Sequence, residues 1–360
     1  MTEKQMRVRL LDLTPHEMET QMAVWGQPAY RARQVQHWLY KKQVSAPSEM
    51  SNLPAALRDR LAEDSQIDLL VPVTETASSD GNTTKALLRL DDGQLIEAVL
   101  MRYNRRRTVC VSSQAGCAIG CTFCATGQMG LQRNLSPGEM LGQVIHFERW
   151  LQSNTPDSGG ITNVVIMGMG EPLANYSNLW RALRAMSSPD GLGLGARRLT
   201  VSTVGLVPGI DRFAEEGLQV NLAVSLHAPN DALREQLVPI NQRYPIADLM
   251  AAIRRYIERT HRRITFEYAL MRDINDSPAL AEEMALLLQG LLCHVNLIPL
   301  NPVTGSPFQP TRREDADIFA GILRDRGIVT SLRVRRGVDI NAGCGQLRAR
   351  VAGSLEKGVL

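Results

Sequence analysis

The feature that most constrains the fold of this 360-residue chain is a regular alternation of apolar, strand-like runs with helical segments, beginning near Thr108. Such alternation predicts a parallel sheet covered by helices and closed, or partly closed, into a barrel. We therefore expect an α/β protein built around a partial (βα)6 barrel. The expected strands are Thr108–Ser112, Ile161–Met167, Leu199–Thr203, Val220–Leu226, Ile264–Ala269 and Val295–Pro299, with another near Ile328–Val334.

Two smaller segments precede the expected barrel. The first holds short helices and begins with a capping box, in which Thr14 caps a helix and Glu17 follows three residues later. Strand-like runs come next, separated by Ser-Ser-Asp-Gly and Asp-Asp-Gly sequences that are typical of turns. The expected divisions are a helical accessory domain at residues 1–70, a β-rich connector at 71–104, the barrel at 105–340, and a C-terminal loop and tail at 341–360.

The composition is ordinary for a globular protein, with 44% hydrophobic and 21% charged residues. No apolar run approaches the length of about 18 residues that a membrane-spanning helix needs. The N-terminus lacks the apolar region of a signal peptide. We therefore expect no membrane contact and a cytoplasmic location, where thiols stay reduced.

Basic residues gather in short runs, although the net charge is only +3. Clustered arginines suit contacts with phosphates, but short basic runs are also common in solvated loops, so charge alone leaves a nucleic-acid partner undecided. The runs are Arg102 with Arg105–Arg107, Arg197–Arg198, Arg262–Arg263, and Arg333 with Arg335–Arg336.

Three cysteines, Cys117, Cys121 and Cys124, follow the first expected barrel strand with C-x3-C-x2-C spacing. A four-iron cluster normally takes four thiolates, so three ligands would leave one iron open to a substrate or cofactor. A zinc site would need a fourth ligand, and the next histidine, His146, lies well along an expected helix. Structural disulfides are disfavoured in a large intracellular chain. The spacing favours an iron–sulfur cluster with an open site.

Polar and glycine residues follow several other expected strands. Because the carboxyl ends of parallel strands meet at one end of a barrel, these residues predict a shared site with the cysteine loop. Glu171 could accept a hydrogen bond from an ammonium group, and its neighbouring glycines allow a ligand to approach the backbone closely. The residues concerned are Gly168–Glu171, Ser202, Ser225–His227 and Asn301.

Two further cysteines have flanking sequences that matter. Cys344 lies between glycines, in a loop that gives a thiol room and access. Cys110 lies on the first barrel strand, where an isolated cysteine is usually a packing residue, and Cys293 is interpreted as packing alone.

These motifs together resemble those of the radical S-adenosylmethionine (SAM) superfamily, whose signature is C-x3-C-x2-C after the first strand of a partial barrel. Further motifs resemble the bacterial dual-specificity adenine-C2 RNA methyltransferase family, and the similarity spans roughly Leu10 to Gly353. They are Ser112–Cys117, Met167–Leu173, Val201–Gly205, Ala223–Ala228 and Cys344–Leu347.

The resemblance implies a role for each of these residues. Cys117, Cys121 and Cys124 would ligate a [4Fe–4S] cluster. SAM would be held by Gly170, Glu171, Ser202, Ser225, Leu226, His227 and Asn301. The catalytic residues would be Cys344, which is itself methylated, Cys110, its partner thiol, and Glu97, a proton acceptor.

The resemblance also implies a mechanism and partners. One SAM would methylate Cys344, and a second would be cleaved reductively to a radical that activates the S-methyl group. Cys110 would then release the methylated RNA by forming a disulfide with Cys344. The implied partners are 23S rRNA, tRNA and an electron donor such as flavodoxin or ferredoxin, with the protein acting as a monomer. The helical accessory domain and the basic runs are candidates for holding the RNA.

Two alternatives stay open. A C8-specific relative that confers antibiotic resistance shares both catalytic cysteines, so residue patterns alone do not fix which adenine carbon is methylated. The second alternative is a non-catalytic iron–sulfur protein that binds RNA or senses redox state. It would use the cluster, but it does not explain why Cys110, Cys344 and Glu97 occur together.

Overall fold

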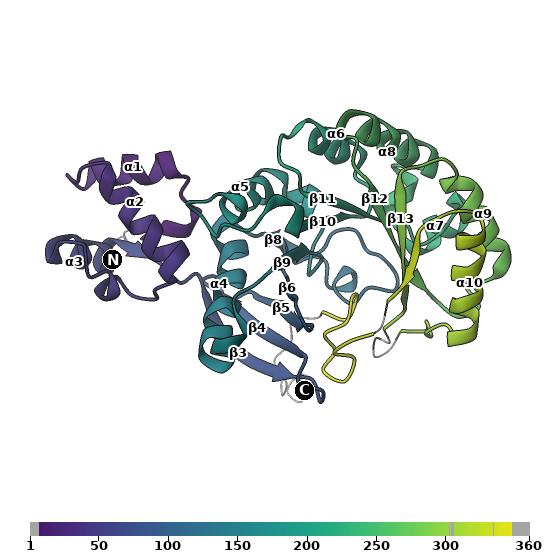
Figure 1. Ribbon diagram of the computed structural model, residues 1–360, viewed down its shortest axis with the longest axis horizontal. Helices are drawn as coiled ribbons and strands as arrows, with labels where there is room; N and C mark the ends of the chain where they lie inside the picture. Colours follow the sequence, from purple (N-terminus) through teal and green to yellow (C-terminus); the bar gives the residue numbers. More distant parts are fainter. Residues whose placement is uncertain (1–6, 302, 304–305, 334, 348–360) are drawn as a thin grey trace, which may run out of the picture.

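A computed structural model describes residues 7–301, 303, 306–333 and 335–347. Its centre is a ten-stranded sheet that curves into a partial barrel (Figure 1), which confirms the expected α/β fold. Adjacent barrel strands pair in parallel. In sheet order, they are β6 (Arg107–Cys110), β9 (Asn163–Ile166), β10 (Leu199–Thr203), β11 (Asn221–Ser225), β12 (Ile264–Leu270), β13 (Cys293–Pro299) and β14 (Thr330–Leu332). Val334, expected at the end of the last strand, lies outside the described residues.

The expected connector continues the barrel sheet. Strands β3 (Leu70–Ala77), β4 (Thr83–Leu90) and β5 (Leu95–Arg102) are antiparallel, and β5 pairs with β6. In this register Val99 lies opposite Lys85 on one side and Cys110 on the other. The connector therefore places its own side chains beside the first barrel strand.

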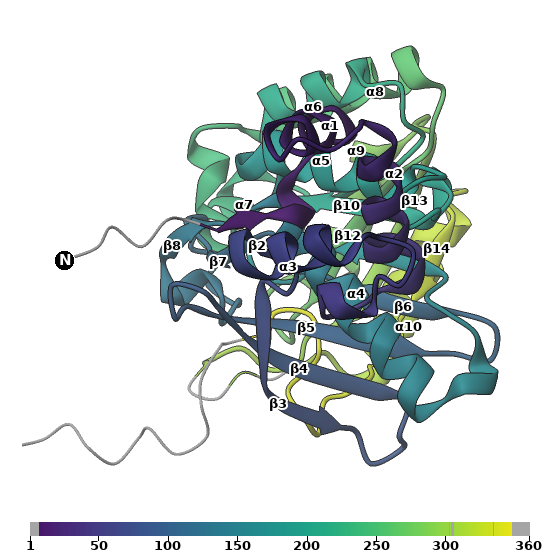
Figure 2. The same cartoon turned by 90° about the vertical axis from the view of Figure 1, so that its left-hand side faces the viewer.

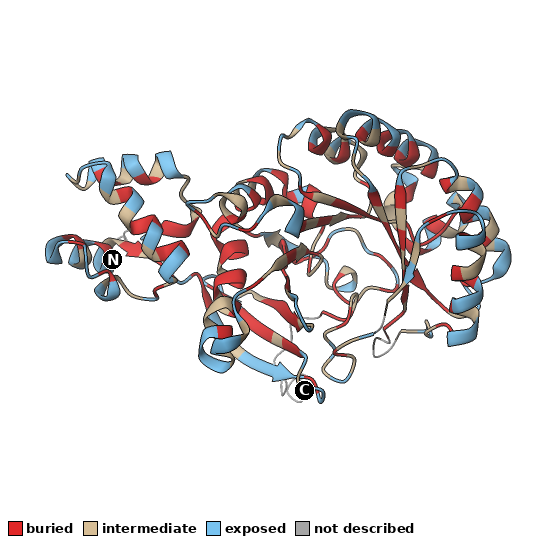
Figure 3. Ribbon diagram, viewed as in Figure 1, coloured by how far each residue is buried: buried red, intermediate tan, exposed pale blue. Residues whose placement is uncertain are grey.

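Helices cover the outside of the curved sheet, with their buried faces turned toward it (Figure 3). Helices α6 and α7 were not among the segments expected from sequence, because they are short and α6 contains a proline and a glycine in its first turn. The covering helices are α4 (Pro137–Asn154), α5 (Tyr176–Ser187), α6 (Val207–Glu215), α8 (Ile246–Thr260), α9 (Pro278–Leu288) and α10 (Arg313–Asp325). Helix α7 (Asp231–Leu237) lies instead against the cysteine loop, where the Thr122 N–H donates to the Leu237 carbonyl oxygen at 3.1 Å.

A small helical module projects from one side of the barrel (Figures 1 and 2). It holds α1 (Pro15–Val24), α2 (Tyr30–His37), α3 (Ala55–Asp64) and a short parallel pair, β1 (Val8–Arg9) with β2 (Ser65–Gln66). The structure confirms the Thr14–Glu17 capping box at the start of α1. None of the described helices is both long and apolar enough to span a bilayer.

An ion pair fixes this module to the barrel. The guanidinium of Arg9 lies 2.8 Å from the fully buried carboxylate of Glu139 in the first turn of α4. Arg133 approaches the same carboxylate at 2.8 Å. Because Glu139 is buried, loss of these cations would leave a desolvated charge. The Arg9 contact therefore supports a fixed placement of the module, while the Arg133 contact lies within the barrel domain.

Candidate active site

A β-hairpin presents the cysteine loop, called the cluster loop below, at the C-terminal end of the barrel. This loop carries Cys117, Cys121 and Cys124. Strands β7 (Gln114–Gly116) and β8 (Leu131–Asn134) pair across its base. Gly116 has a φ of +75°, and a Cβ there would lie 1.9 Å from the carbonyl oxygen of Gly130. Only glycine fits this close crossing, so the hairpin closes tightly beneath the three cysteines.

The three loop cysteines are largely withdrawn from solvent. Burial raises the pKa of Cys117 to about 11, and nearby Cys124 adds to the effect. Burial and the two neighbouring thiols raise the pKa of Cys121 as well. Three such sulfurs become thiolates together only beside compensating positive charge, which an iron–sulfur cluster provides. In the part of the chain that the structure describes, no three Cys, His, Asp or Glu side chains form a site for a single metal ion.

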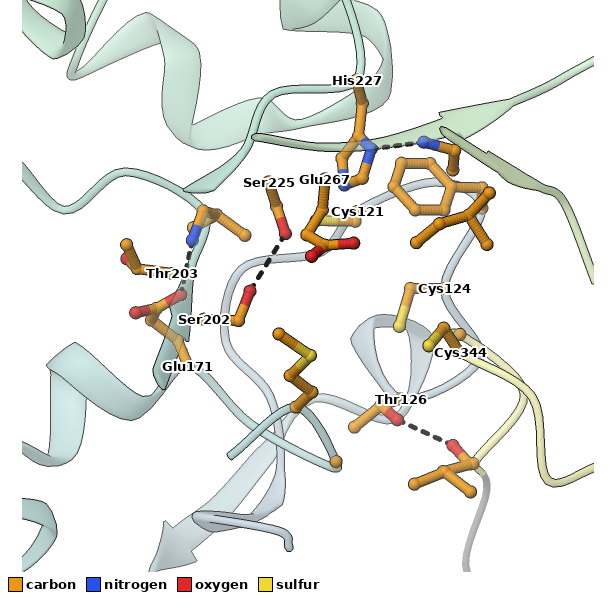
Figure 4. Close-up of a pocket in the computed structure, with 18 of the residues that line it drawn as sticks. Cys121, Cys124, Thr126, Glu171, Ser202, Thr203, Ser225, His227, Glu267 and Cys344 are labelled. Carbon is orange, nitrogen blue, oxygen red and sulfur yellow. Dashed lines mark hydrogen bonds between the residues drawn. The ribbon is translucent and has the colours of Figure 1, made fainter. Parts of the chain in front are cut away.

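A cavity opens beside this loop, where the parallel strands end (Figure 4). Most of the residues that the resemblance assigns to the site line it: Cys121, Cys124, Gly170, Glu171, Ser202, Ser225, His227, Asn301 and Cys344. Figure 4 shows Cys344, from the C-terminal loop, directed toward Cys124 of the cluster loop. The fold thus joins residues that are far apart in sequence.

Glu171 is buried at the side of the cavity. Its two carboxylate oxygens accept hydrogen bonds from the backbone N–H groups of Leu173, at 3.0 Å, and Val204, at 2.9 Å. Burial raises its pKa to about 7 despite these bonds. A positively charged ligand group would favour the ionised form, so this carboxylate suits recognition of an amino group.

The polar side chains of Ser202, Ser225 and Asn301 also line the cavity. The hydroxyl oxygens of Ser202 and Ser225 are 3.4 Å apart. Asn301 donates to the Cys344 carbonyl oxygen at 3.3 Å, whereas its own Oδ1 is buried with no hydrogen-bond partner among the described residues. A buried acceptor of this kind gains a partner when a ligand with a donor binds.

His227 lies at the end of β11 with a left-handed φ of 62°. Its Nδ1 accepts a hydrogen bond from the Ala269 backbone N–H at 3.0 Å. Burial, reinforced by the charge of Arg234, lowers the pKa of His227 to about 3. The imidazole is therefore neutral, and its remaining proton sits on Nε2, which makes His227 a donor.

Leu226 does not face the cavity, unlike Ser225 and His227 on either side of it. Its side chain is fully buried in the core and does not line the cavity. Its carbonyl oxygen accepts from Arg234 Nε at 3.1 Å, while its N–H donates to the Glu267 carbonyl at 3.0 Å. Leu226 thus acts through the backbone that supports Ser225 and His227.

A second, smaller cavity lies between Cys110 and Cys344, the two thiols to which the resemblance assigns methyl transfer. Cys110 and Cys344 both line it, together with Val99, Met101 and Arg333. Burial raises the pKa of Cys110 to about 12, and a charge on Cys344 contributes in the same direction. Cys344 therefore faces the cluster loop on one side and Cys110 on the other.

Glu97 lies near this second cavity but is not one of the described residues that line it. Strand alternation puts Glu97 on the same face of β5 as Val99 and Met101. Its carboxylate is 2.9 Å from the Lys85 ammonium, which also donates to the Asn341 carbonyl oxygen at 3.3 Å. Lys85 thus links Glu97 to the loop that carries Cys344.

Several site residues were missed by reasoning from the sequence. Arg333 Nη1 lies 3.7 Å from the Cys344 sulfur, although its basic run had suggested only phosphate contacts. Glu267 lines the cavity from the middle of β12, where an isolated charge in an apolar strand was the available signal. Thr126 donates to the Leu347 carbonyl at 2.7 Å, which ties the C-terminal loop to the cluster loop.

The comparisons with known proteins agree with this geometry. Residues 111–284 match the Radical SAM superfamily, and residues 8–67 match the ribosomal RNA large subunit methyltransferase N-terminal domain. A curated relative from Roseiflexus sp. (strain RS-1), named probable dual-specificity RNA methyltransferase RlmN, is 47% identical over 94% of this chain and 95% of its own. A relative of the same name from Chloroflexus aurantiacus is 50% identical over 95% and 93%.

A solved structure extends the similarity to three dimensions. The crystal structure of a radical SAM methyltransferase from Sphaerobacter thermophilus superposes with a TM-score of 0.93 at 54% identity, covering 95% of this chain and all of that one. The thiol set, the unsatisfied amide of Asn301 and the buried carboxylate of Glu171 fit the [4Fe–4S] cluster and SAM that the superfamily uses. This chain belongs to the RlmN family of radical SAM RNA methyltransferases.

Proposed function

We propose that this protein methylates C2 of an adenosine in 23S rRNA and in tRNA, using Cys344 as the methyl carrier and Cys110 as the thiol that releases the product. The observation that carries the proposal is the position of Cys344, which lines both the cavity beside the cluster loop and the cavity that contains Cys110. One sulfur can therefore receive a methyl group on one side and be attacked from the other.

Two sets of residues would hold the cluster and SAM. Cys117, Cys121 and Cys124 hold the [4Fe–4S] cluster, and Gly170, Glu171, Ser202, Ser225, Leu226, His227 and Asn301 hold SAM. When bound, these groups supply a 5′-deoxyadenosyl radical, which suits an electron-poor carbon that polar methyl transfer does not reach.

Cys344 and Cys110 act in sequence. The Cys344 thiolate would attack the methyl carbon of one SAM, so that a carbon–sulfur bond forms as the methyl–sulfonium bond breaks and S-adenosylhomocysteine leaves. A second SAM in each turnover, held by the same residues, would supply the radical that takes a hydrogen atom from the methyl group on Cys344. Once this carbon has bonded to C2 and the adduct has given up one electron, which the bound cluster would accept, Glu97 accepts the C2 proton. The Cys110 thiolate then attacks the Cys344 sulfur; the sulfur–carbon bond breaks, its electron pair stays on the carbon, and a proton completes the methyl group of the product. The disulfide then has to be reduced before another turnover.

Anaerobic reconstitution with 23S rRNA fragments and tRNA tests this proposal. Nucleoside mass spectrometry should find 2-methyladenosine from both substrates, whereas 8-methyladenosine alone would favour the C8 alternative. Cys344→Ala should abolish methylation, and retained methylation would contradict the carrier role. Cys110→Ala should accumulate an RNA–protein crosslink, because the release step is lost. The structurally remote Cys293→Ala serves as the matched control.

The remaining partners complete the proposal. The need to reduce a disulfide after each turnover supports a cytoplasmic setting, and all six cysteines are free thiols in this structure. We propose that a monomer receives its electron from flavodoxin or ferredoxin. Turnover with each purified donor and size-exclusion chromatography coupled to light scattering test these points.

A further inference from the structure

A wide cleft opens at the end of the barrel opposite the candidate active site. It has a volume of about 980 Å³ and is lined where the parallel strands begin, by Thr108, Asn163, Thr200, Asn221, Thr265 and His294. The candidate active-site cavity is lined where the same strands end. The barrel therefore has two openings, which lie on opposite sides of its lumen.

Arginine dominates the charge of this opening, which we call the arginine cleft. Its arginines are Arg106, Arg197, Arg262, Arg263, Arg333 and Arg336. Glu267 is the one carboxylate among the described residues of the lining. Members of all four basic runs in the sequence thus converge on one surface.

None of these six arginines has a carboxylate within the 4.0 Å of an ion pair in the described structure, although Arg333 interacts at longer range with Glu267 and Arg336 with Asp80. Arginines on the outer helices differ, since Arg255 pairs with Asp211 at 2.8 Å and Arg326 with Glu282 at 2.7 Å. Six guanidinium groups gathered around a lining whose described part holds a single carboxylate create a positive field suited to the phosphates of a nucleic acid.

An aromatic ring accompanies the charges. The guanidinium carbons of Arg106 and Arg336 lie 4.4 and 4.5 Å from the centre of the Tyr103 ring, which also lines the cleft. Flat aromatic and guanidinium surfaces are the groups on which unstacked RNA bases rest. The cleft therefore offers both backbone and base contacts.

The arginine cleft adjoins the two cavities that Cys344 lines. Met167 and Arg333 line the cleft and both cavities that contain Cys344. At the other end of the barrel, the Ala125 N–H donates to the Gly345 carbonyl oxygen at 2.8 Å, so the C-terminal loop is attached to the cluster loop. Cys344 thus lies between the cluster loop and the cavities that adjoin the arginine cleft.

We propose that single-stranded or locally unpaired RNA docks on the arginine cleft, and that its target adenosine passes through the barrel lumen to Cys344 from the side opposite SAM. This inference rests on the proposed function and adds the docking surface and the direction of entry. A flipped nucleotide can reach a buried site in this way, because the enzyme holds the backbone outside and accepts only the base.

The test compares R197A/R263A, which removes two exposed cleft arginines, with the control R255A/R259A on the outer face of α8. Affinity for a fluorescent tRNA anticodon stem-loop is measured at several salt concentrations. The cleft variant should bind the RNA about tenfold more weakly than the wild type. A plot of log affinity against log salt concentration should be less steep by roughly 1.5 for this variant, because two phosphate contacts are lost. The control should match the wild type, and R197K/R263K should recover most of the affinity because it keeps the charge.

Two readouts separate this inference from the proposed function. Methylation of Cys344 by SAM without RNA should be the same in the wild type and the cleft variant, by intact-protein mass. If R197A/R263A binds RNA with unchanged affinity and salt slope while wild-type protein methylates RNA, the docking surface is wrong and the proposed function stands. If wild-type protein methylates neither Cys344 nor RNA, the proposed function itself fails.

Discussion

Arg333 Nη1 lies 3.7 Å from the Sγ atom of Cys344, the sulfur that we propose as methyl carrier. Negative charge on Cys344 is the main influence that raises the pKa of the Arg333 guanidinium. A cation held beside a sulfur can make a charge-assisted contact with it. Arg333 is therefore placed to orient the Cys344 sulfur for the proposed attack on SAM.

Replacing Arg333 should slow the first methyl transfer. Arg333→Met keeps much of the side-chain volume but removes the charge-assisted contact, so the rate of Cys344 methylation should fall about 10- to 100-fold. Arg333→Lys should retain more activity than Arg333→Met. Intact-protein mass spectrometry after rapid mixing with SAM measures the rate, with Arg326→Met on an outer helix as control. An unchanged rate in Arg333→Met would contradict the role.

The Lys85 contact predicts a defect at a later step. Lys85→Met removes the ion pair with Glu97 and the bond to the Asn341 carbonyl. We expect kcat for RNA methylation to fall about tenfold or more, because proton removal and loop placement both depend on this ammonium. Methylation of Cys344 itself should change much less. The exposed Arg89→Met on the same strand is the control, and an equal loss in both variants would contradict a specific role for Lys85.

Truncation of Arg234 should reduce the stability of the protein more than truncation of Arg333 or Lys85. Its side chain is fully buried, and its guanidinium donates to the carbonyl oxygens of Leu226, at 3.1 Å, and Val204, at 2.6 Å, and to Asn241 Oδ1, at 2.7 Å. Arg234→Met leaves these acceptors buried and unpaired. The free energy of unfolding should fall by about 3–5 kcal/mol.

Chemical denaturation under anaerobic conditions measures this loss of stability. The control is Arg243→Met, whose guanidinium is exposed and which should change stability by less than about 0.5 kcal/mol. A loss of similar size in both variants would show that the buried hydrogen bonds of Arg234 contribute little.

The buried His227 predicts how stability responds to acid. Its folded-state pKa of about 3 lies below the usual 6.5, so the unfolded chain takes up a proton first as the pH falls. The stabilising contribution of neutral His227 is therefore complete above about pH 6.5 and is lost as the pH falls toward 3. Between pH 7.5 and 5.5, the wild type should lose more thermal stability than His227→Gln. Exposed His16→Gln should follow the wild type, and parallel curves for all three proteins would refute the prediction.

Local sequence signals determined much of the scaffold. Strand β10 occupies Leu199–Thr203, as expected from its apolar run, and the capping box expected at Thr14 forms. The C-x3-C-x2-C spacing predicted the cluster chemistry that the family comparison supports. These features depend on side chains close together in sequence, so a short window contains the physical information they need.

Tertiary structure decided which distant groups act on one another. Lys85 meets Glu97 through the pairing of β4 with β5, and Arg333 meets Cys344 because the C-terminal loop returns to the barrel. Each basic run is ambiguous alone. Arg106, Arg197, Arg262 and Arg263 come shortly before strands that begin at one end of the barrel, whereas Arg333 and Arg336 follow β14, so only the fold brings all six into one cleft. The sequence by itself determined the chemical groups and the repeating fold. The curvature of the sheet set the distances between those groups, because proximity across neighbouring parallel strands leaves no local pattern in the chain.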